Sequence, residues 1–160
     1  MPGPFHEAHQ VVERATAHLE RIRRKPTADK FYEASVMIDQ KFPKVVRVDA
    51  LKTLLKLPSA KVVPFLLDSI LVKEADSGFR MDIHEQLARA ERPMHINALA
   101  KRFPTLRDED RLAIAKFLGM YEVSKDHPVV AKALADPLES IRAYASPGFW
   151  ESLIRQTKKK

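Results

Sequence analysis

The sequence predicts an all-α fold, an α-solenoid of about four helical hairpins preceded by an N-terminal capping helix. The chain has only 4 glycines against 11 prolines and no alternating apolar pattern, which argues against an all-β fold. Apolar residues recur at helical spacing in segments that prolines separate. In addition, one arginine motif returns after 33, 31 and 31 residues, and a self-similar period of this length is typical of stacked repeats.

Four arginines mark the predicted repeat: Arg47, Arg80, Arg111 and Arg142. Each is followed three residues later by an aliphatic residue, and in three of the four it is preceded by an apolar residue. The exception precedes Arg111, where Asp110 occupies the apolar position. One hairpin cannot bury its apolar face alone, so stacked neighbours must cover it. We therefore expect the four arginines to be structural, and a ligand-binding role is the alternative.

Length and composition limit the class of protein. The 160 residues suffice for one domain, which would bury about 70% of the surface that the unfolded chain exposes. The absence of cysteine excludes disulfides and thiolate metal sites and favours a cytoplasmic location. No apolar run approaches the length of a membrane span, and residues 1–10 lack the pattern of a secretory signal. The net charge of +7 is compatible with an acidic partner or with nucleic acid.

The first predicted region, residues 1–26, is a short leader over residues 1–5 and a capping helix that begins at His6 and stops at Pro26. This helix ends in a basic cluster, Arg21, Arg23, Arg24 and Lys25. Cations stabilise the C-terminus of a helix because they face the negative end of its dipole. The alternative is a patch that binds phosphate or an acidic partner.

The second region, residues 27–150, is predicted to hold four helical hairpins. Thr27 is expected to cap the first helix, and Asp76-Ser77-Gly78 is expected to form a turn. The most apolar segment is predicted to be buried on most sides, with a kink at Pro64. The expected helices cover residues 28–41, 45–57, 60–74, 79–90, 94–103, 107–120, 129–135 and 138–145.

The last region, residues 151–160, is predicted to be a C-terminal cap and a basic tail. Apolar residues on both sides of its first residue, Phe149, Trp150, Leu153 and Ile154, are expected to fold back over the end of the stack. An exposed apolar end would otherwise favour association. Lys158, Lys159 and Lys160 form the tail.

The repeat resembles short HEAT repeats of bacterial proteins, the kind also found in phycobilisome lyases. The segment from Val62 to Leu67, with its proline, followed by Phe79-Arg80 is similar to the two helices of a HEAT unit. Asp136 lies six residues before Arg142, and Glu74 lies six residues before Arg80, as in the aspartate–arginine pair of the family. The positions six residues before Arg47 and Arg111 are Lys41 and Thr105, where this pairing is lost. The resemblance implies that the arginines bridge to the turn of their own or of the adjacent unit.

The sequence lacks a pattern that would support catalysis. His6, His9 and Glu13 have the spacing of metal ligands on a helix, but a third strong ligand is missing and surface histidines explain them better. His84-Glu85 is similar to the pairs of HEAT-built di-iron hydroxylases, yet the other units have no such pair. Glycine-rich phosphate loops, HExxH and GxSxG are absent. We therefore expect no enzyme, no cofactor and no metal site.

The exposed sides of the second helices are the expected binding surface, since the inner rows of a solenoid usually bind its partners. Counting five residues past each repeat arginine gives Lys52, Glu85, Lys116 and Pro147. Counting nine residues gives Lys56, Arg89, Met120 and Glu151. These rows are mostly basic in the first three units, so Lys52, Lys56, Arg89 and Lys116 are predicted to form a concave basic face. A solvated helix face without function is the alternative.

Three functions are compatible with this face. The leading hypothesis is a non-catalytic scaffold that binds another protein or an acidic peptide, with no membrane partner. The second is nucleic-acid binding on a surface similar to that of HEAT-like DNA glycosylases, for which the nearest aromatic residues are Tyr121 and Tyr144. The third, an accessory subunit or lyase-like chaperone in tetrapyrrole attachment, is implied by the resemblance alone.

Overall fold

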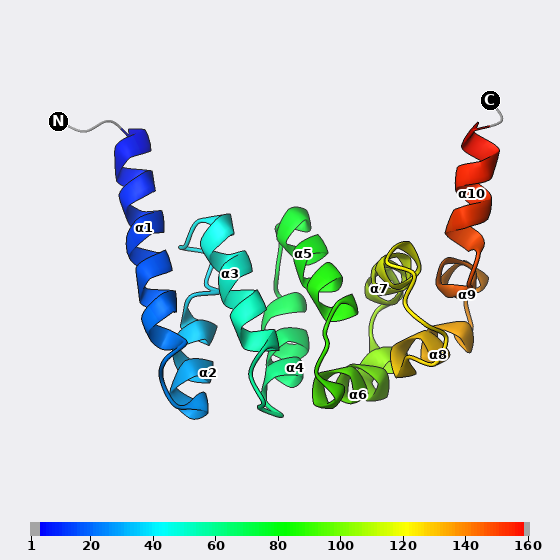
Figure 1. Cartoon of the computed structure of the whole chain (residues 1–160), viewed down its shortest axis with the longest axis horizontal. Helices are drawn as coiled ribbons and strands as arrows, with labels where there is room; N and C mark the ends of the chain where they lie inside the picture. Colours follow the sequence, from blue (N-terminus) through cyan, green and yellow to red (C-terminus); the bar gives the residue numbers. More distant parts are fainter. Residues whose placement is uncertain (1–3, 159–160) are drawn as a thin grey trace. The chain divides into compact units, whose positions relative to one another are not determined.

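The computed structural model describes residues 4–158, and the side chains of residues 9–157 (Figure 1). Within this range the chain is all-α, as predicted, with ten α-helices, one π-helix, one 3-10 helix and no strand. It divides into two compact units, Met1–Phe79 and Arg80–Lys160, and the boundary falls inside one helix. No helix in the described range is long and apolar enough to cross a membrane.

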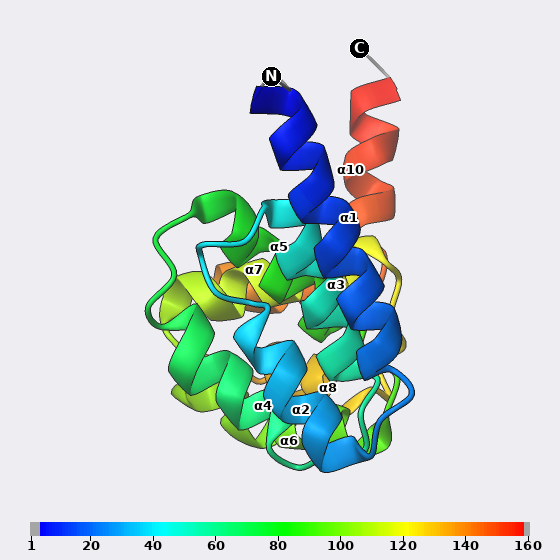
Figure 2. The same ribbon diagram turned by 90° about the vertical axis from the view of Figure 1, so that its left-hand side faces the viewer.

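The first unit is built from three longer helices and one composite helix. α1 packs on α2 and α3, and α2 and α3 form an antiparallel hairpin (Figures 1 and 2). Fully buried leucine and isoleucine side chains from α1 and α3, including Leu19, Ile22, Leu51 and Leu54, form its core. The elements are α1 (Pro4–Ile22), α2 (Thr27–Val36), α3 (Lys44–Leu55), α4 (Val62–Phe65) and the π-helix η1 (Leu66–Leu71).

The second unit contains most of α5 (Ser77–Ala88) and all later elements. α6 packs on α8, α8 on α9, and α7 on both α8 and α9, while α10 packs on α9 and α7 (Figure 1). Its core includes Ile114, Leu118, Val129 and Ile141, each at most 1% exposed. These elements are α6 (Pro93–Arg102), the 3-10 helix η2 (Phe103–Thr105), α7 (Asp108–Met120), α8 (Pro128–Leu134), α9 (Glu139–Ala145) and α10 (Phe149–Lys158).

Proline marks the start of five α-helices in the described range, and Pro4 is the first residue of α1. Pro26 and Pro43 are the N-cap residues of α2 and α3, where their extended backbone leads the chain into the first turn. Pro93 and Pro128 are the first residues of α6 and α8. At this position the missing N–H is not needed, because the first turn has no intrahelical acceptor for it. The proline pattern therefore separates helices as the sequence predicts.

The helix expected over residues 60–74 differs from its prediction. It begins only at Val62, so Pro64 lies in the first turn, where a proline does not force a kink. The irregularity follows it, because the backbone changes from α to π at Leu66. The segment is also less buried than predicted: Leu66, Leu67 and Leu71 are at most 1% exposed, but Val72 is 58% exposed.

Other boundaries differ by a few residues. α1 begins at Pro4, inside the expected leader, and α2 ends at Val36 rather than at residue 41. α5 begins at Ser77, inside the expected turn. The reason is Asp76, whose Oδ1 accepts hydrogen bonds from the backbone N–H groups of Gly78 (2.8 Å) and Phe79 (3.4 Å). A carboxylate in this position caps a helix and allows it to start early.

Candidate binding surface

Arg47 is buried in the first unit and joins two of its turns. Its Nε donates to the carbonyl oxygen of Ile38 at 2.7 Å, and its Nη2 donates to Glu74. The guanidinium lies 3.8 Å from the ring centroid of Phe79. Both partners of the ion pair are nearly inaccessible, with side chains 7% and 3% exposed. Arg47 therefore holds the turn after α2 to the segment that precedes α5.

The other three repeat arginines make comparable contacts in the second unit. Arg80 donates to Asp110 at 3.1 Å and to Glu109 at 2.9 Å. Arg111 donates to the Asp136 carboxylate at 2.8 Å and to the carbonyl oxygen of Leu106 at 2.7 Å. Arg142 donates to the backbone carbonyl of Asp136 at 2.6 Å. Arg47, Arg111 and Arg142 therefore bond to turns between helices, and Arg80 bonds to the first turn of α7.

A common rule connects these contacts. Arg47, Arg80 and Arg111 bond to carboxylates 27, 30 and 25 residues further along the chain. Glu74 and Asp136, the acids that the sequence pairs with Arg80 and Arg142, bond through their carboxylates to the preceding repeat arginine. Sequence reasoning missed the third acid, Asp110. The sequence does contain a signal for it, because Asp110 stands where the other repeat arginines are preceded by an apolar residue. It supplies the acid that is missing six residues before Arg111, where Thr105 stands.

Asp110 lies in a buried polar cluster of the second unit and is 2% exposed. His84 Nε2 lies 2.8 Å from its Oδ1, and Arg107 Nε donates to its Oδ2 at 2.9 Å. Burial alone would raise the pKa of Asp110, but the hydrogen bonds from His84 and Arg107 outweigh it and hold the pKa below its usual value. Similarly, the hydrogen bond that Arg111 donates to Asp136 raises the pKa of Arg111 against the effect of burial. These charges are paired within the fold.

The four predicted partner-binding residues fall into both units. Lys52 and Lys56 are exposed at the C-terminal end of α3 in the first unit. Arg89 is exposed just after α5, and Lys116 is half-buried on α7, both in the second unit. The structure thus brings Arg89 and Lys116 into one compact body.

Arg89 and Lys116 each lie over a tyrosine ring. Arg89 Cζ is 4.9 Å from the ring centroid of Tyr121, and Lys116 Nζ is 4.9 Å from that of Tyr144. The Tyr121 hydroxyl donates to Glu85 at 2.6 Å, a hydrogen bond that raises the pKa of Tyr121. A cation over an aromatic face is attracted by the ring quadrupole and keeps its charge toward solvent. We call Arg89, Lys116, Tyr121 and Tyr144 the cation–aromatic row.

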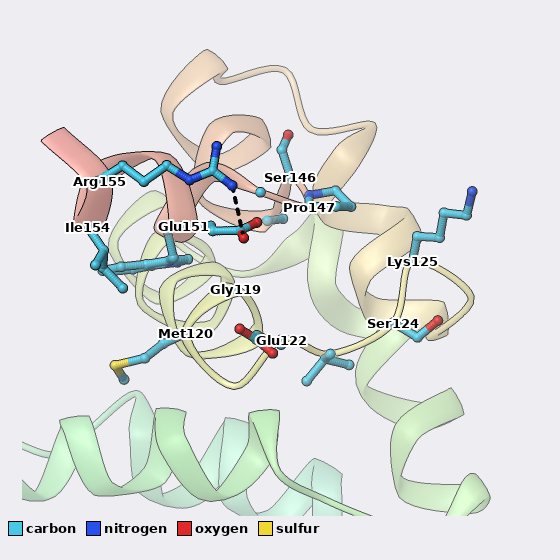
Figure 3. Close-up of a pocket in the computed structure, with 14 residues that line it drawn as sticks. Gly119, Met120, Glu122, Ser124, Lys125, Ser146, Pro147, Glu151, Ile154 and Arg155 are labelled. Carbon is cyan, nitrogen blue, oxygen red and sulfur yellow. Dashed lines mark hydrogen bonds and ion pairs between the residues drawn. The ribbon is translucent and has the colours of Figure 1, made fainter.

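The row leads to a groove of about 900 Å³ between the end of α7, the turn after α9, and α10 (Figure 3). Met120 approaches it from α7, Ile154 from α10, and Pro147 from the turn between α9 and α10. We call this cavity the C-terminal groove. It is lined by Gly119, Met120, Glu122, Val123, Ser124, Lys125, Ala145, Ser146, Pro147, Gly148, Trp150, Glu151, Ile154 and Arg155. Met120, Pro147 and Glu151 are also the positions that the repeat count places on the binding rows.

Gly119 permits the packing that shapes this groove. A Cβ atom at this position would lie 2.1 Å from the backbone oxygen of Tyr144 and 2.5 Å from Trp150 Nε1. The missing side chain therefore lets α7 approach both α9 and the indole of Trp150. Trp150 is further held by Tyr144 and Phe149, with ring centroids 5.8 and 5.9 Å away.

The remaining sequence hypotheses concern the basic cluster and the histidines. Arg23 pairs with Glu20 and, at 2.9 Å, with Asp49, and Lys25 pairs with Glu33 at 2.7 Å. These contacts favour a structural role for half of the basic cluster. His9 pairs with Glu13 at 2.9 Å, and the side chain of His6 lies outside the described residues. The described part of the chain contains no group of three or more residues that could hold a metal ion.

Comparisons of the chain with known protein families, with curated proteins and with solved structures gave no match. Its function is therefore inferred from the surface of the molecule itself.

Proposed function

We propose that the chain is a non-catalytic, HEAT-like helical-repeat scaffold that binds an acidic segment of another protein. The proposed contact residues are Lys52, Lys56, Arg89 and Lys116. The recurring link from an arginine to a carboxylate 25 to 30 residues ahead supports the repeat. Such a link joins neighbouring hairpins, which is what a stack of similar hairpins requires.

The observation that carries the proposal is the placement of Arg89 and Lys116 over tyrosine rings. Among the residues that the structure describes, neither cation forms an ion pair with a carboxylate. The rings restrict the two long side chains before any partner arrives, so less conformational entropy is lost on binding. Carboxylates of a partner would then complete charge-assisted hydrogen bonds that the fold leaves unmade.

The nucleic-acid alternative uses the same cations but has less support from the tyrosines. Proteins that bind single strands stack bases on aromatic side chains. Here Tyr121 is engaged by Arg89, Glu85 and the stacked ring of Phe117, whose centroid lies 6.3 Å away. Tyr144 is likewise engaged by Lys116 and by the rings of Phe149 and Trp150. Neither ring is an open stacking platform, so only backbone contacts to phosphate remain.

Binding of two simple polyanions separates these functions. The probes are a 20-residue polyglutamate peptide and a 20-base-pair duplex of random sequence, titrated at about 0.1 M salt, where the Debye length is about 10 Å. We expect the peptide to bind, and the Arg89→Glu/Lys116→Glu variant to weaken it about tenfold or more. The Lys52→Glu/Lys56→Glu variant tests the first unit in the same way.

The matched control is Lys101→Glu/Lys132→Glu, which changes the net charge equally at exposed positions on α6 and α8. If this control weakens peptide binding as much as the row variant, the effect is one of net charge and the proposed surface is wrong. Duplex binding that falls log-linearly with salt and exceeds peptide binding would favour the nucleic-acid function instead.

A further inference from the structure

The part of α10 that follows Trp150 has few contacts with the rest of the second unit, and its apolar side chains are exposed. The apolar residues of α10 lie on one side of the helix, and Phe149 and Trp150 at its start pack against Tyr144. Further along the same side, Leu153 and Ile154 are 42% and 52% exposed. An isolated helix shorter than about 12 to 15 residues is marginal in water. The exposed turns of this ten-residue helix would therefore gain stability from a partner that covers their apolar side.

The C-terminal groove lies beside this exposed side and continues it. Trp150 and Ile154 of α10 line the groove. Figure 3 shows Ile154 on α10 and Met120, which is 47% exposed, on α7. The volume of about 900 Å³ lies within the range of sites that enclose a ligand, about 300 to 1,000 Å³. Large apolar side chains of a partner can therefore enter it.

The groove is also continuous with the cation–aromatic row. Lys116 lies over Tyr144, and the ring of Tyr144 contacts that of Trp150 in the groove wall. At the rim, Arg155 is paired with Glu151 at 3.1 Å, and Lys125 lies on the loop after α7. Lys125 therefore lies at the groove itself, and Lys116 lies outside its lining, over the Tyr144 ring that packs on Trp150.

We propose that the C-terminal groove binds one amphipathic acidic helix of a partner protein, with apolar side chains against Met120, Trp150 and Ile154 and carboxylates toward Lys116 and Lys125. This inference rests on the proposed function and names the form of its partner. A helix fits because unit 2 is built by helix-on-helix packing, and its described residues include no strand edge that could pair with an extended peptide.

Charge and packing favour an acidic protein over other occupants. A second copy of this chain carries the same net charge of +7, so the two copies repel each other. A lipid surface would require the aromatic side chains of α10, but the indole nitrogen of Trp150 is buried against Gly119. An acidic helix is attracted by the net charge of +7, with its apolar side facing the part of the groove that holds Glu122 and the paired Glu151.

Trp150 is the only tryptophan of the chain, so its fluorescence reports directly on the groove. The probe is a tryptophan-free, 18-residue peptide with leucines at positions i, i+3, i+4 and i+7 and glutamates on the opposite side. Two controls are the same composition with leucines distributed around the helix, and polyglutamate. We expect only the amphipathic peptide to shift the Trp150 emission to shorter wavelength, with saturation at micromolar concentration and a gain of peptide helicity.

Variants assign the effect to the groove. Met120→Asp and Ile154→Asp change exposed residues, and each is expected to weaken binding of the amphipathic peptide about tenfold or more. Met94→Asp is the matched control, since Met94 is 39% exposed on α6 and does not line the groove. Circular dichroism of each variant verifies that the fold is retained.

The outcomes distinguish this inference from the proposed function. If polyglutamate and the amphipathic peptide bind equally and Met120→Asp changes neither, the helix-in-groove inference is overturned and the acidic-partner function stands. If Arg89→Glu/Lys116→Glu leaves both affinities unchanged, the proposed function fails as well. A Trp150 shift that follows protein concentration, or one caused by anionic vesicles alone, assigns the groove to a second copy or to a membrane and overturns the inference. Absence of any shift at millimolar peptide also overturns it.

Discussion

The repeat arginines and the cation–aromatic row use the same chemistry in opposite environments. Arg111 is 8% exposed and donates to the buried carboxylate of Asp136, whereas Arg89 is exposed and lies over the Tyr121 ring. Breaking a buried ion pair leaves an uncompensated charge and costs about 3 to 5 kcal/mol. An exposed cation–π contact such as that of Arg89 contributes about 0.5 to 1 kcal/mol. The comparison indicates that the first set of cations holds the fold and that the second is available to a partner.

The largest expected effect follows from removing a buried carboxylate. Asp136→Ala removes the buried carboxylate that pairs with Arg111 and leaves it only the exposed Asp108, 2.9 Å away, so we expect a loss of about 3 kcal/mol in the free energy of unfolding, the low end for a broken buried pair. Urea denaturation measures this loss. The control is Glu139→Ala at an exposed position of α9. If the Asp136→Ala variant were as stable as the control, the claim that the buried repeat arginines hold the fold would be wrong.

The pH dependence of stability tests whether the buried carboxylate of Asp110 holds the fold in its ionised form. Its folded pKa lies below the usual value of 3.8, so its ionised form stabilises the fold. This contribution is complete above the unfolded pKa and is lost as pH falls through the folded pKa. We expect Asp110→Asn to cost about 2 to 3 kcal/mol at neutral pH, because charge-assisted bonds are lost, and to flatten the decline of stability below about pH 4. Unfolding free energies between pH 2 and 7 measure both, and an unchanged acid limb would contradict the assignment.

Gly119→Ala tests the packing behind the groove. The added Cβ would meet the backbone oxygen of Tyr144, which cannot move without displacing α9. Overpacking of this kind costs about 1 to 3 kcal/mol, and the displaced indole should change the Trp150 emission. Thermal unfolding and fluorescence are the measurements. The control is Gly148→Ala. A Cβ atom there would have no neighbour within 4 Å, but φ is +85°, so this variant reports backbone strain alone, whereas Gly119→Ala reports crowding. A stable Gly119→Ala variant with native emission would contradict this packing.

The smallest effect on stability is expected in the row itself. Arg89→Ala removes an exposed cation–π contact, so we expect a change of about 0.5 to 1 kcal/mol or less in unfolding free energy. Its effect should be seen in polyglutamate affinity instead. Tyr121→Leu, which removes the ring beneath Arg89, should weaken the same affinity by a smaller factor. A loss of stability comparable to that of Asp136→Ala would place Arg89 among the structural arginines.

The all-α class and the position of most helices were predictable because prolines and helical periodicity act locally. The composite helix of residues 62–71 was not. Its change to π geometry at Leu66 depends on how its buried leucines meet the rest of the first unit, and no local signal separates it from an α-helix.

The candidate site was predictable only in part. Spacing from the repeat arginines led to Arg89, Lys116 and Met120, since residues at fixed offsets share a helix face. The role of Asp110 and the groove required coordinates, because each depends on residues that meet from different helices. Tyr121, for example, joins Glu85 across 36 residues of sequence.

The most direct test of the account is the polyglutamate affinity of the Arg89→Glu/Lys116→Glu variant, measured beside that of Lys101→Glu/Lys132→Glu at equal net charge. The account predicts that the first variant binds about tenfold more weakly or worse, while the second stays near the unmodified chain and both remain folded. Equal affinities for the two variants would contradict it.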